Sequence, residues 1–289
     1  MTARVEVALA AGAELGEGPV WDPRDDRLLW VDCERGGLHR FDPATGRDAV
    51  VATVAQPGAI AWRQAGGYVV AGGAGFLCVD AGGTVTTLAD VVQGGAAVRM
   101  NDGACDVRGR FWAGTATADR RPGAALFHLD ADGTVTRAVA GVGLSNGIGW
   151  SPDDRRMYYV DSATQGLDVF AFDADNGCVR ARRRLVEVPA GLGIPDGLAV
   201  DADGCVWLAL WGPGLVQRYT PRGALDRSVR LPTGNTTSCT FGGPALDVLF
   251  VTSARAGLDV AQRAGQPHAG AVFAVSPGVA GLPAAGYAG

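Results

Sequence analysis

A short segment headed by glycine or another small residue recurs six times along this chain of 289 residues. The copies are anchored at Gly18, Gly58, Gly103, Gly147, Gly197 and Ser238, with steps of 40, 45, 44, 50 and 41 residues. After each anchor, apolar and β-branched residues alternate between turns rich in Pro, Gly and Asp, which is typical of strands and hairpins. A strand-rich period of about 40–50 residues is the signature of a β-propeller. We therefore expect an all-β, six-bladed β-propeller with four-stranded antiparallel blades.

The repeat leaves one strand over at the N-terminus. Residues 5–9 precede the first anchor, and we expect them to pair with residues 270–275 and complete the last blade. Such closure by the N-terminal strand removes free sheet edges. No linker or low-complexity stretch divides the chain, so residues 1–289 are expected to form a single domain. Residues 256–270 are expected to form a long polar loop that covers one face of the ring.

Composition excludes several classes of function. The net charge of −5 gives no basic face for nucleic acid. No run of 18 apolar residues is present, so no membrane-spanning helix is expected. The six cysteines form no C-x-x-C pair, and we interpret them as small buried residues in a reducing cytosol. A cytoplasmic protein, either a monomer or a weak homo-oligomer, is the expectation.

The residue just before the anchor carries the chemistry. It is Glu17, Asp102, Asn146 and Asp196 in four of the six copies. A radial fold brings equivalent positions together around one axis. Converging oxygen ligands suit Ca²⁺, Mg²⁺ or Mn²⁺, and also Zn²⁺ where carboxylates dominate. For any one of these residues alone, a purely local role in a turn stays open, but their shared position in the repeat favours one divalent metal site.

The motifs, taken in order along the chain, resemble those of the gluconolactonase/regucalcin (senescence marker protein) family. The matching segments are residues 15–21, 99–103, 111–115, 145–147, 195–197 and 241–244. The resemblance implies a six-bladed propeller that binds one divalent ion and opens sugar-acid lactones, which makes the protein a lactonase.

The same resemblance implies roles for individual residues. Glu17, Asn146 and Asp196 match the metal ligands of the family. Arg99 and Asn101 match residues that contact the substrate, and an acidic substrate-binding position of the family falls on Asp119. Since Asp196 would need only one oxygen to hold the ion, the other could take a proton from the attacking water, so Asp196 is also the expected catalytic base.

Other functions remain open at this point. The leading hypothesis is hydrolysis of an aldonolactone, such as a glucono- or pentonolactone, to the aldonic acid. A metal-dependent esterase acting on an arylester or organophosphate would use the same ion on another substrate. A non-enzymatic calcium-binding or regulatory propeller would need no arginine beside the ligands. Lactone hydrolysis measured with and without a chelator separates the three.

Overall fold

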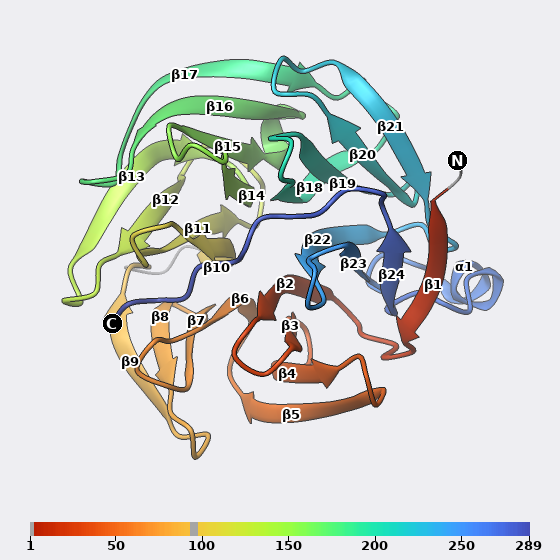
Figure 1. Ribbon diagram of the computed structural model, residues 1–289, viewed down its shortest axis with the longest axis horizontal. Coiled ribbons are helices and arrows are strands. Elements are labelled where there is room, and N and C mark those ends of the chain that lie inside the picture. Colours follow the sequence, from red (N-terminus) through yellow and green to blue (C-terminus); the bar gives the residue numbers. More distant parts are fainter. Residues whose placement is uncertain (1–2, 93–97) are drawn as a thin grey trace.

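The computed structural model describes residues 3–92 and 98–289, which form six antiparallel sheets of four strands each around a central axis (Figure 1). The innermost strands of the sheets are β2 (Gly16–Asp22), β6 (Pro57–Trp62), β10 (Val98–Cys105), β14 (Ser145–Trp150), β18 (Ile194–Val200) and β22 (Thr236–Gly242). Each of them packs against the innermost strands of the two neighbouring blades, so the ring is closed. The predicted six-bladed β-propeller is confirmed.

The remaining strands continue outward from the axis in chain order. The second strands are β3 (Arg27–Asp32), β7 (Tyr68–Gly72), β11 (Phe111–Thr117), β15 (Arg156–Asp161), β19 (Val206–Trp211) and β23 (Val248–Ser253). The third strands are β4 (Gly37–Asp42), β8 (Gly75–Val79), β12 (Ala124–Leu129), β16 (Gly166–Asp173), β20 (Leu215–Tyr219) and β24 (Val272–Ser276). The outer strands are β5 (Arg47–Thr53), β9 (Val85–Asp90), β13 (Val135–Val142), β17 (Cys178–Glu187), β21 (Leu225–Arg230) and β1 (Arg4–Leu9).

The N-terminal strand closes the ring as expected. Strand β1 pairs antiparallel with β24, with Val5 opposite Val275 and Val7 opposite Phe273. The last blade is therefore built from both ends of the chain, in the order β1-β24-β23-β22.

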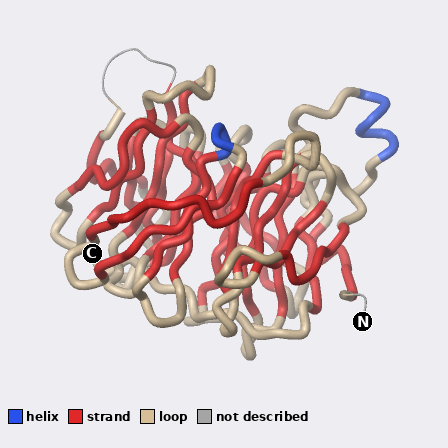
Figure 2. Tube along the Cα trace, turned by 90° about the horizontal axis from the view of Figure 1, so that it is seen from above, coloured by secondary structure: helices blue, strands red, loops and turns tan. Residues whose placement is uncertain are grey.

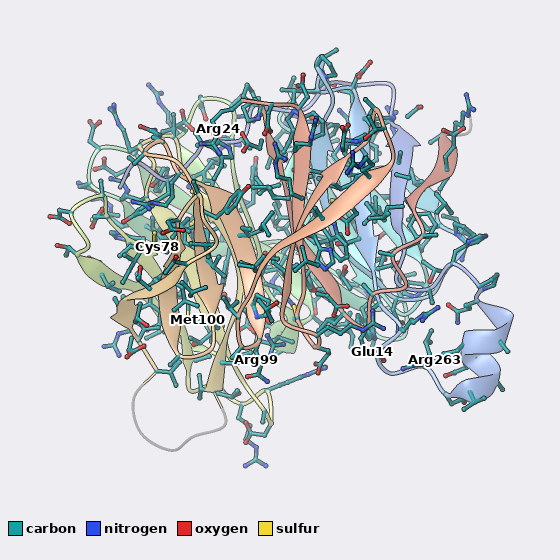
Figure 3. All side chains as sticks on the ribbon, turned by 90° about the horizontal axis from the view of Figure 1, so that it is seen from below. Glu14, Arg24, Cys78, Arg99, Met100 and Arg263 are labelled. Carbon is teal, nitrogen blue, oxygen red and sulfur yellow. The ribbon has the colours of Figure 1, made fainter. Side chains whose placement is uncertain are left out.

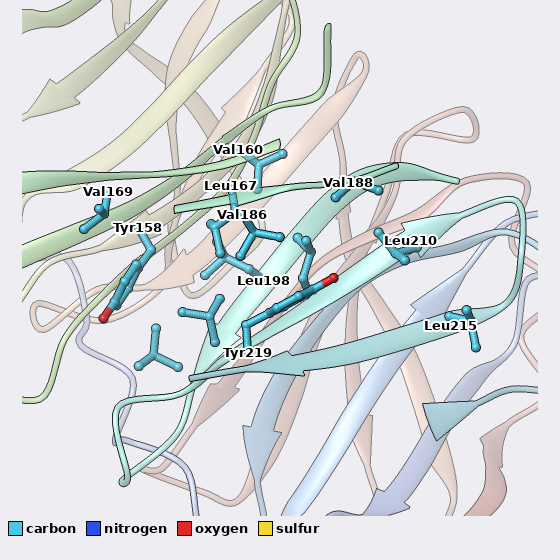
Figure 4. Close-up of a cluster of buried hydrophobic side chains, with 13 residues drawn as sticks. Tyr158, Val160, Leu167, Val169, Val186, Val188, Leu198, Leu210, Leu215 and Tyr219 are labelled. Carbon is cyan, nitrogen blue, oxygen red and sulfur yellow. The ribbon is translucent and has the colours of Figure 1, made fainter. Parts of the chain in front are cut away.

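Apolar side chains fill the spaces between neighbouring blades. Between the fourth and fifth blades, Val160 and Leu167 pack with Leu198, Leu210 and Tyr219 (Figure 4). Burial of this kind is the main favourable term in folding. Because each blade contributes both of its faces to such layers, the innermost strands are held in fixed positions around the axis.

The segment after β24 lies across the axis on one face of the ring (Figure 1). Its backbone exchanges hydrogen bonds with hairpin turns of four blades: Ala202 donates to Ala280, Gly281 to Leu246, Tyr287 to Trp62, and Ala288 to Gly109. Figure 3 places Arg24, from a hairpin turn, and Arg99 on opposite faces of the molecule. The C-terminal segment therefore ties together the face that carries the hairpin turns.

The expected loop over residues 256–270 contains a short helix, α1 (Val260–Gly265). Asp259 and Gln262 form a capping box at its N-terminus. Viewed from the side, α1 projects at the rim of the ring (Figure 2), where Arg263 pairs with Glu14. The expectation that this segment covers a face is therefore wrong, because the helix lies beside the ring and buries none of its own residues.

The expectation that the cysteines are small buried residues is confirmed for four of the six. All six cysteines are free; four are buried, Cys105 is half-buried and Cys178 is exposed. Among the residues that the structure describes, no helix has the length and apolar character needed to cross a membrane.

Candidate functional site

Every blade shifts register between its first two strands, and the six shifts fall at equivalent places. They occur between residues 17 and 20, 57 and 59, 100 and 103, 145 and 148, 195 and 198, and 236 and 239. A bulge takes residues out of the ladder and redirects their side chains. Asn101, Asp102, Asn146 and Asp196 lie inside these bulges, and Glu17 is the last paired residue before one. The repeated anchor in the sequence is thus a repeated bulge beside the axis.

Glycine allows the bulges of neighbouring blades to approach closely. A Cβ atom on Gly147 would lie 2.8 Å from the carbonyl oxygen of Asp196, and one on Gly58 would lie 2.4 Å from that of Asn101. Real Cβ atoms do not tolerate such distances, so only glycine fits. The close contact brings the polar side chains of successive blades to the same level of the axis.

A chain of hydrogen bonds connects two of these polar residues, Asn101 and Asn146, with each other and with Ser162. The Nδ2 atom of Asn101 donates to the carbonyl oxygen of Ser145 at 2.6 Å and to Oδ1 of Asn146 at 2.8 Å. The Nδ2 atom of Asn146 donates to the hydroxyl of Ser162 at 2.8 Å. Since both hydrogens of the Asn101 amide are used, this side chain offers a ligand only its Oδ1 atom.

Burial and mutual repulsion characterise the carboxylates at the axis. Burial raises the pKa of Glu17 well above its usual value, and the charges of Asp196 and Asp102 raise it further. The hydrogen bond from the Gly18 amide and the charge of Arg99 act in the opposite direction. A buried carboxylate close to two others requires a proton or a cation to be stable.

Asp196 is also a buried carboxylate whose pKa is raised. Burial and the charge of Asp102 raise its pKa, while the charges of Arg120 and Arg99 lower it. The carboxylate receives no hydrogen bond from residues 3–92 or 98–289. Burial also raises the pKa of Asp102 to about 7, although its Oδ1 atom accepts a hydrogen bond of 2.8 Å from the amide of Gly103.

The oxygen atoms at the axis can form a site for a divalent ion only if the side-chain amide of Asn146 is counted among the ligands. In the described part of the chain, no three His, Cys, Asp or Glu side chains are grouped so that they alone could hold a metal. Glu17 and Asp196 supply two desolvated carboxylates, and Oδ1 of Asn146 has one lone pair left after accepting from Asn101. Two carboxylates and one carbonyl-type oxygen are a suitable partial ligand set for Ca²⁺, Mg²⁺ or Mn²⁺.

Arginine side chains add positive charge beside this set. Arg99 follows Val98 on β10, and its Nη1 atom donates to the carbonyl oxygen of Met100 at 3.0 Å. Its side chain forms no ion pair with the described residues, yet its charge acts on both Glu17 and Asp196. Among the described residues, the other guanidinium donors of Arg99 have no partner, and Arg99 lies on the face opposite Arg24 (Figure 3).

Among the described residues, Asp119 pairs with a neighbouring arginine and with none of this group. Its Oδ1 atom accepts a hydrogen bond of 3.2 Å from the amide of Arg121, and its carboxylate lies 3.7 Å from the Arg121 guanidinium. The Asp119 side chain is 62% exposed. Its neighbour Arg120 acts on Asp196 through its charge and was not identified from the sequence. A substrate contact by Asp119 stays a prediction.

A cavity of about 500 Å³ occupies the axis beyond the polar site. Gly18, Asp102, Trp150 and Phe241, from four inner strands, line it together with Leu282 from the C-terminal segment. Glu17, Asn146 and Asp196 do not border it. The cavity belongs to the face of the hairpin turns, so the hydrogen-bonded side chains, and not this cavity, mark the candidate site.

Residues 15–255 match the SMP-30/gluconolactonase/LRE-like region family. Regucalcin of Danio rerio is 38% identical over 292 residues, which cover 99% of each chain. Pentonolactonase XacC of Haloferax volcanii is 39% identical over 276 residues, which cover 93% of each.

Solved structures of two similar proteins superpose on this fold. A calcium-binding protein, regucalcin, from Agrobacterium tumefaciens superposes with a TM-score of 0.94 at 29% identity, over 99% of this chain and 98% of that one. A gluconolactonase from Xanthomonas campestris superposes with a TM-score of 0.75 at 23% identity, over 95% of this chain and 89% of that one, and supports the fold. The chain belongs to the SMP-30/gluconolactonase/LRE-like family.

Proposed function

We propose that this protein is a divalent-metal-dependent lactonase that opens a sugar-acid lactone to the aldonic acid. The observation that carries the proposal is the grouping of two buried carboxylates, Glu17 and Asp196, with the oriented amide of Asn146 and with Arg99, whose guanidinium forms no ion pair with the described residues. Family membership and 39% identity to a protein named pentonolactonase support this substrate class.

Glu17, Asn146 and Asp196 would hold the ion. When bound, a divalent ion supplies Lewis-acid polarisation of an ester carbonyl and stabilises developing negative charge. Similarity to a structure described as a calcium-binding protein favours Ca²⁺ among the candidates, which include Mg²⁺, Mn²⁺ and Zn²⁺.

The protein's own side chains bind and orient the substrate. Arg99 has a fixed positive charge and presents a fork of donors to hydroxyl or lactone oxygens. Asn101 offers only its Oδ1 atom, because its amide hydrogens are used within the protein. It would therefore accept a hydrogen bond from a sugar hydroxyl, which an ester without hydroxyls could not donate.

Asp196 would remove a proton from the attacking water. Its carboxylate receives no hydrogen bond from the described residues, so an oxygen is available for this role. The proton moves from water to Asp196 as the water oxygen adds to the lactone carbonyl, and the ring C–O bond then breaks. Asp196 can return the proton to the leaving hydroxyl group, which balances the hydrolysis.

A calcium-binding regulatory propeller is the second candidate, because regucalcins are among the similar proteins. Hydrolysis of glucono- and pentonolactones, followed at constant pH by titration of the acid formed, separates the two. We expect turnover that a chelator abolishes and that Ca²⁺, Mn²⁺ or Zn²⁺ restores. Ion binding without turnover of any lactone would favour the regulatory protein, and hydrolysis of arylesters alone would favour the esterase.

A further inference from the structure

Ser162 lies between two of the expected metal ligands. Its hydroxyl accepts a hydrogen bond of 2.8 Å from Nδ2 of Asn146, on β14. The same hydroxyl donates a hydrogen bond of 2.5 Å to the carbonyl oxygen of Pro195, the residue before Asp196 on β18. One side chain therefore connects the fourth blade to the fifth blade at the level of the candidate site.

The local backbone holds this serine in place. Ser162 begins the short 3₁₀ helix η1 (Ser162–Thr164), directly after β15. Asp161 caps the helix by accepting from the amide of Ala163 at 3.2 Å, and it also accepts from the amide of Leu144 at 3.0 Å. The amide of Ser162 donates to the carbonyl oxygen of Leu144 at 3.0 Å. Only 4% of Ser162 is exposed, so water does not compete for its hydroxyl.

The direction of these hydrogen bonds decides which atom of Asn146 reaches the axis. A carbonyl oxygen can only accept, so the Ser162 hydroxyl hydrogen must point at Pro195. The serine oxygen can then only accept from Asn146, which requires the NH₂ group of the amide to face it. The Oδ1 atom is consequently turned toward Asn101, whose amide donates to it. If the Asn146 amide were flipped, its NH₂ group would face the NH₂ group of Asn101 and would also face the ion.

We propose that Ser162 is a positioning residue that fixes the oxygen of Asn146 toward the divalent ion and ties it to the backbone that carries Asp196. The inference rests on the proposed function, because it assumes the metal site. Residues that orient metal ligands typically contribute 10- to 100-fold to metal affinity. Ser162 is expected to act through Asn146 without touching the ion or the substrate.

The test measures ion binding directly. Calcium and manganese affinities are determined by isothermal titration calorimetry for the full chain and for Ser162→Ala. We expect the variant to bind each ion about 10- to 100-fold more weakly. Ser253→Ala is the matched control, because Ser253 is also buried and donates to a backbone carbonyl, that of Ala271 at 2.7 Å, in the sixth blade. The control is expected to lower Tm but to keep the wild-type affinity.

A second variant, Ser162→Cys, tests the inference if Ser162→Ala does not fold. Ser162→Cys keeps the shape and replaces the hydroxyl with a weaker donor and acceptor. The fold accepts a thiol at this place, because Cys33 stands directly after β3 in the first blade as Ser162 does after β15. We expect an affinity between those of wild type and Ser162→Ala.

A double-mutant cycle distinguishes orientation from general stability. Asn146→Asp has two equal oxygens, so its orientation no longer matters. In that background, Ser162→Ala is expected to change ion affinity by no more than about twofold. An equal loss in both backgrounds would overturn the inference, since it would show that Ser162 does not act through the amide.

The remaining outcomes separate the inference from the proposed function. If wild type binds an ion and Glu17→Gln does not, while Ser162→Ala binds like wild type, only the role of Ser162 is wrong. If wild type binds neither Ca²⁺, Mn²⁺ nor Zn²⁺, the metal site itself is overturned, and the role of Ser162 with it.

Discussion

The Nδ2 atom of Asn101 donates a hydrogen bond of 2.8 Å to Oδ1 of Asn146, so an expected substrate-binding residue directly holds an expected metal ligand. The family resemblance assigns metal binding to Asn146 and substrate binding to Asn101, and this hydrogen bond couples the two residues. A change at Asn101 should affect the ion and the lactone together.

The first prediction follows from that bond. Asn101→Ala removes both amide donors and is expected to weaken ion affinity about tenfold and to raise KM for the lactone. Calorimetry and steady-state kinetics at saturating ion measure the two effects. Asn235→Ala is the control, because Asn235 is equally buried but donates to Ala256 in the sixth blade. Wild-type ion affinity in Asn101→Ala would contradict the coupling.

The second prediction concerns the two carboxylates. Glu17→Gln and Asp196→Asn keep the shape of each side chain and remove one negative charge. Ion affinity is expected to fall by more than about 100-fold, beyond the range typical of residues that only orient ligands. Metal content after dialysis, measured by mass spectrometry, checks this result. Full metal content together with normal turnover in both variants would show that the ion, if present, is held elsewhere.

Much of the fold could be predicted from the sequence because it repeats. The spacing of the anchors predicts the number of blades, and the unpaired strand β1 (Arg4–Leu9) predicts how the ring closes. Helix α1 could not be predicted from hydrophobic periodicity, because none of its residues is buried; only the Asp259 and Gln262 capping pair marks it. The C-terminal segment binds other blades through backbone atoms, which carry no sequence pattern.

The candidate site could be predicted only in part. The shared repeat position indicated Glu17, Asp102, Asn146 and Asp196 as candidates, and equivalent bulges lie at these places. The choice of Glu17, Asn146 and Asp196 as metal ligands came from the family resemblance and stays a prediction. Ser162 directly follows β15 (Arg156–Asp161), and nothing in its local sequence indicates the contact that it makes with a neighbouring blade. The direction of the Asp119 side chain depends on a pairing with Arg121 that a motif match cannot show.

The third prediction tests Arg99. Its guanidinium forms no ion pair with the described residues, so Arg99→Ala should leave the ion bound. Loss of a donor that stabilises developing charge commonly lowers kcat about 100- to 1,000-fold, and a decrease of that size in kcat/KM is expected. Lactone kinetics and metal content are measured on the same sample. Loss of the ion, or unchanged kinetics, would show that the assigned role is wrong.

The fourth prediction compares neighbours in the loop after β11 (Phe111–Thr117). Arg120 acts on Asp196 through its charge, whereas Arg121 pairs with the exposed Asp119. Arg120→Ala is expected to change KM or the pH dependence of kcat, and Arg121→Ala is expected to change neither. Asp119→Asn tests the predicted substrate contact in the same assay. Equal kinetics in Arg120→Ala and Arg121→Ala would exclude a specific role for Arg120.

The last prediction concerns stability against pH. Burial raises the pKa values of Glu17 and Asp196, and that of Asp102 to about 7. In the ion-free protein these groups keep protons that the unfolded chain releases near pH 4. The folded state then binds more protons than the unfolded state, so the free energy of unfolding decreases as pH rises. The stabilising contribution of these protonated carboxyl groups is complete below their pKa in the unfolded chain. It is lost as pH rises through their pKa in the folded protein.

Ion binding should reverse this trend. A divalent ion needs ionised carboxylates and displaces their protons, so its stabilising effect should increase with pH. We expect Tm of the chelator-treated protein to fall from roughly pH 5 to pH 8, because the free energy of unfolding decreases by at most about 1.4 kcal/mol per pH unit for each group. The increase in Tm on adding Ca²⁺ should be larger at the upper end of that range. Glu17→Gln, which cannot ionise at this position, should show a weaker pH dependence without ion. A Tm that is independent of pH in the ion-free wild type would mean that the three carboxylates are not held in the buried, mutually repelling arrangement from which the metal site is inferred.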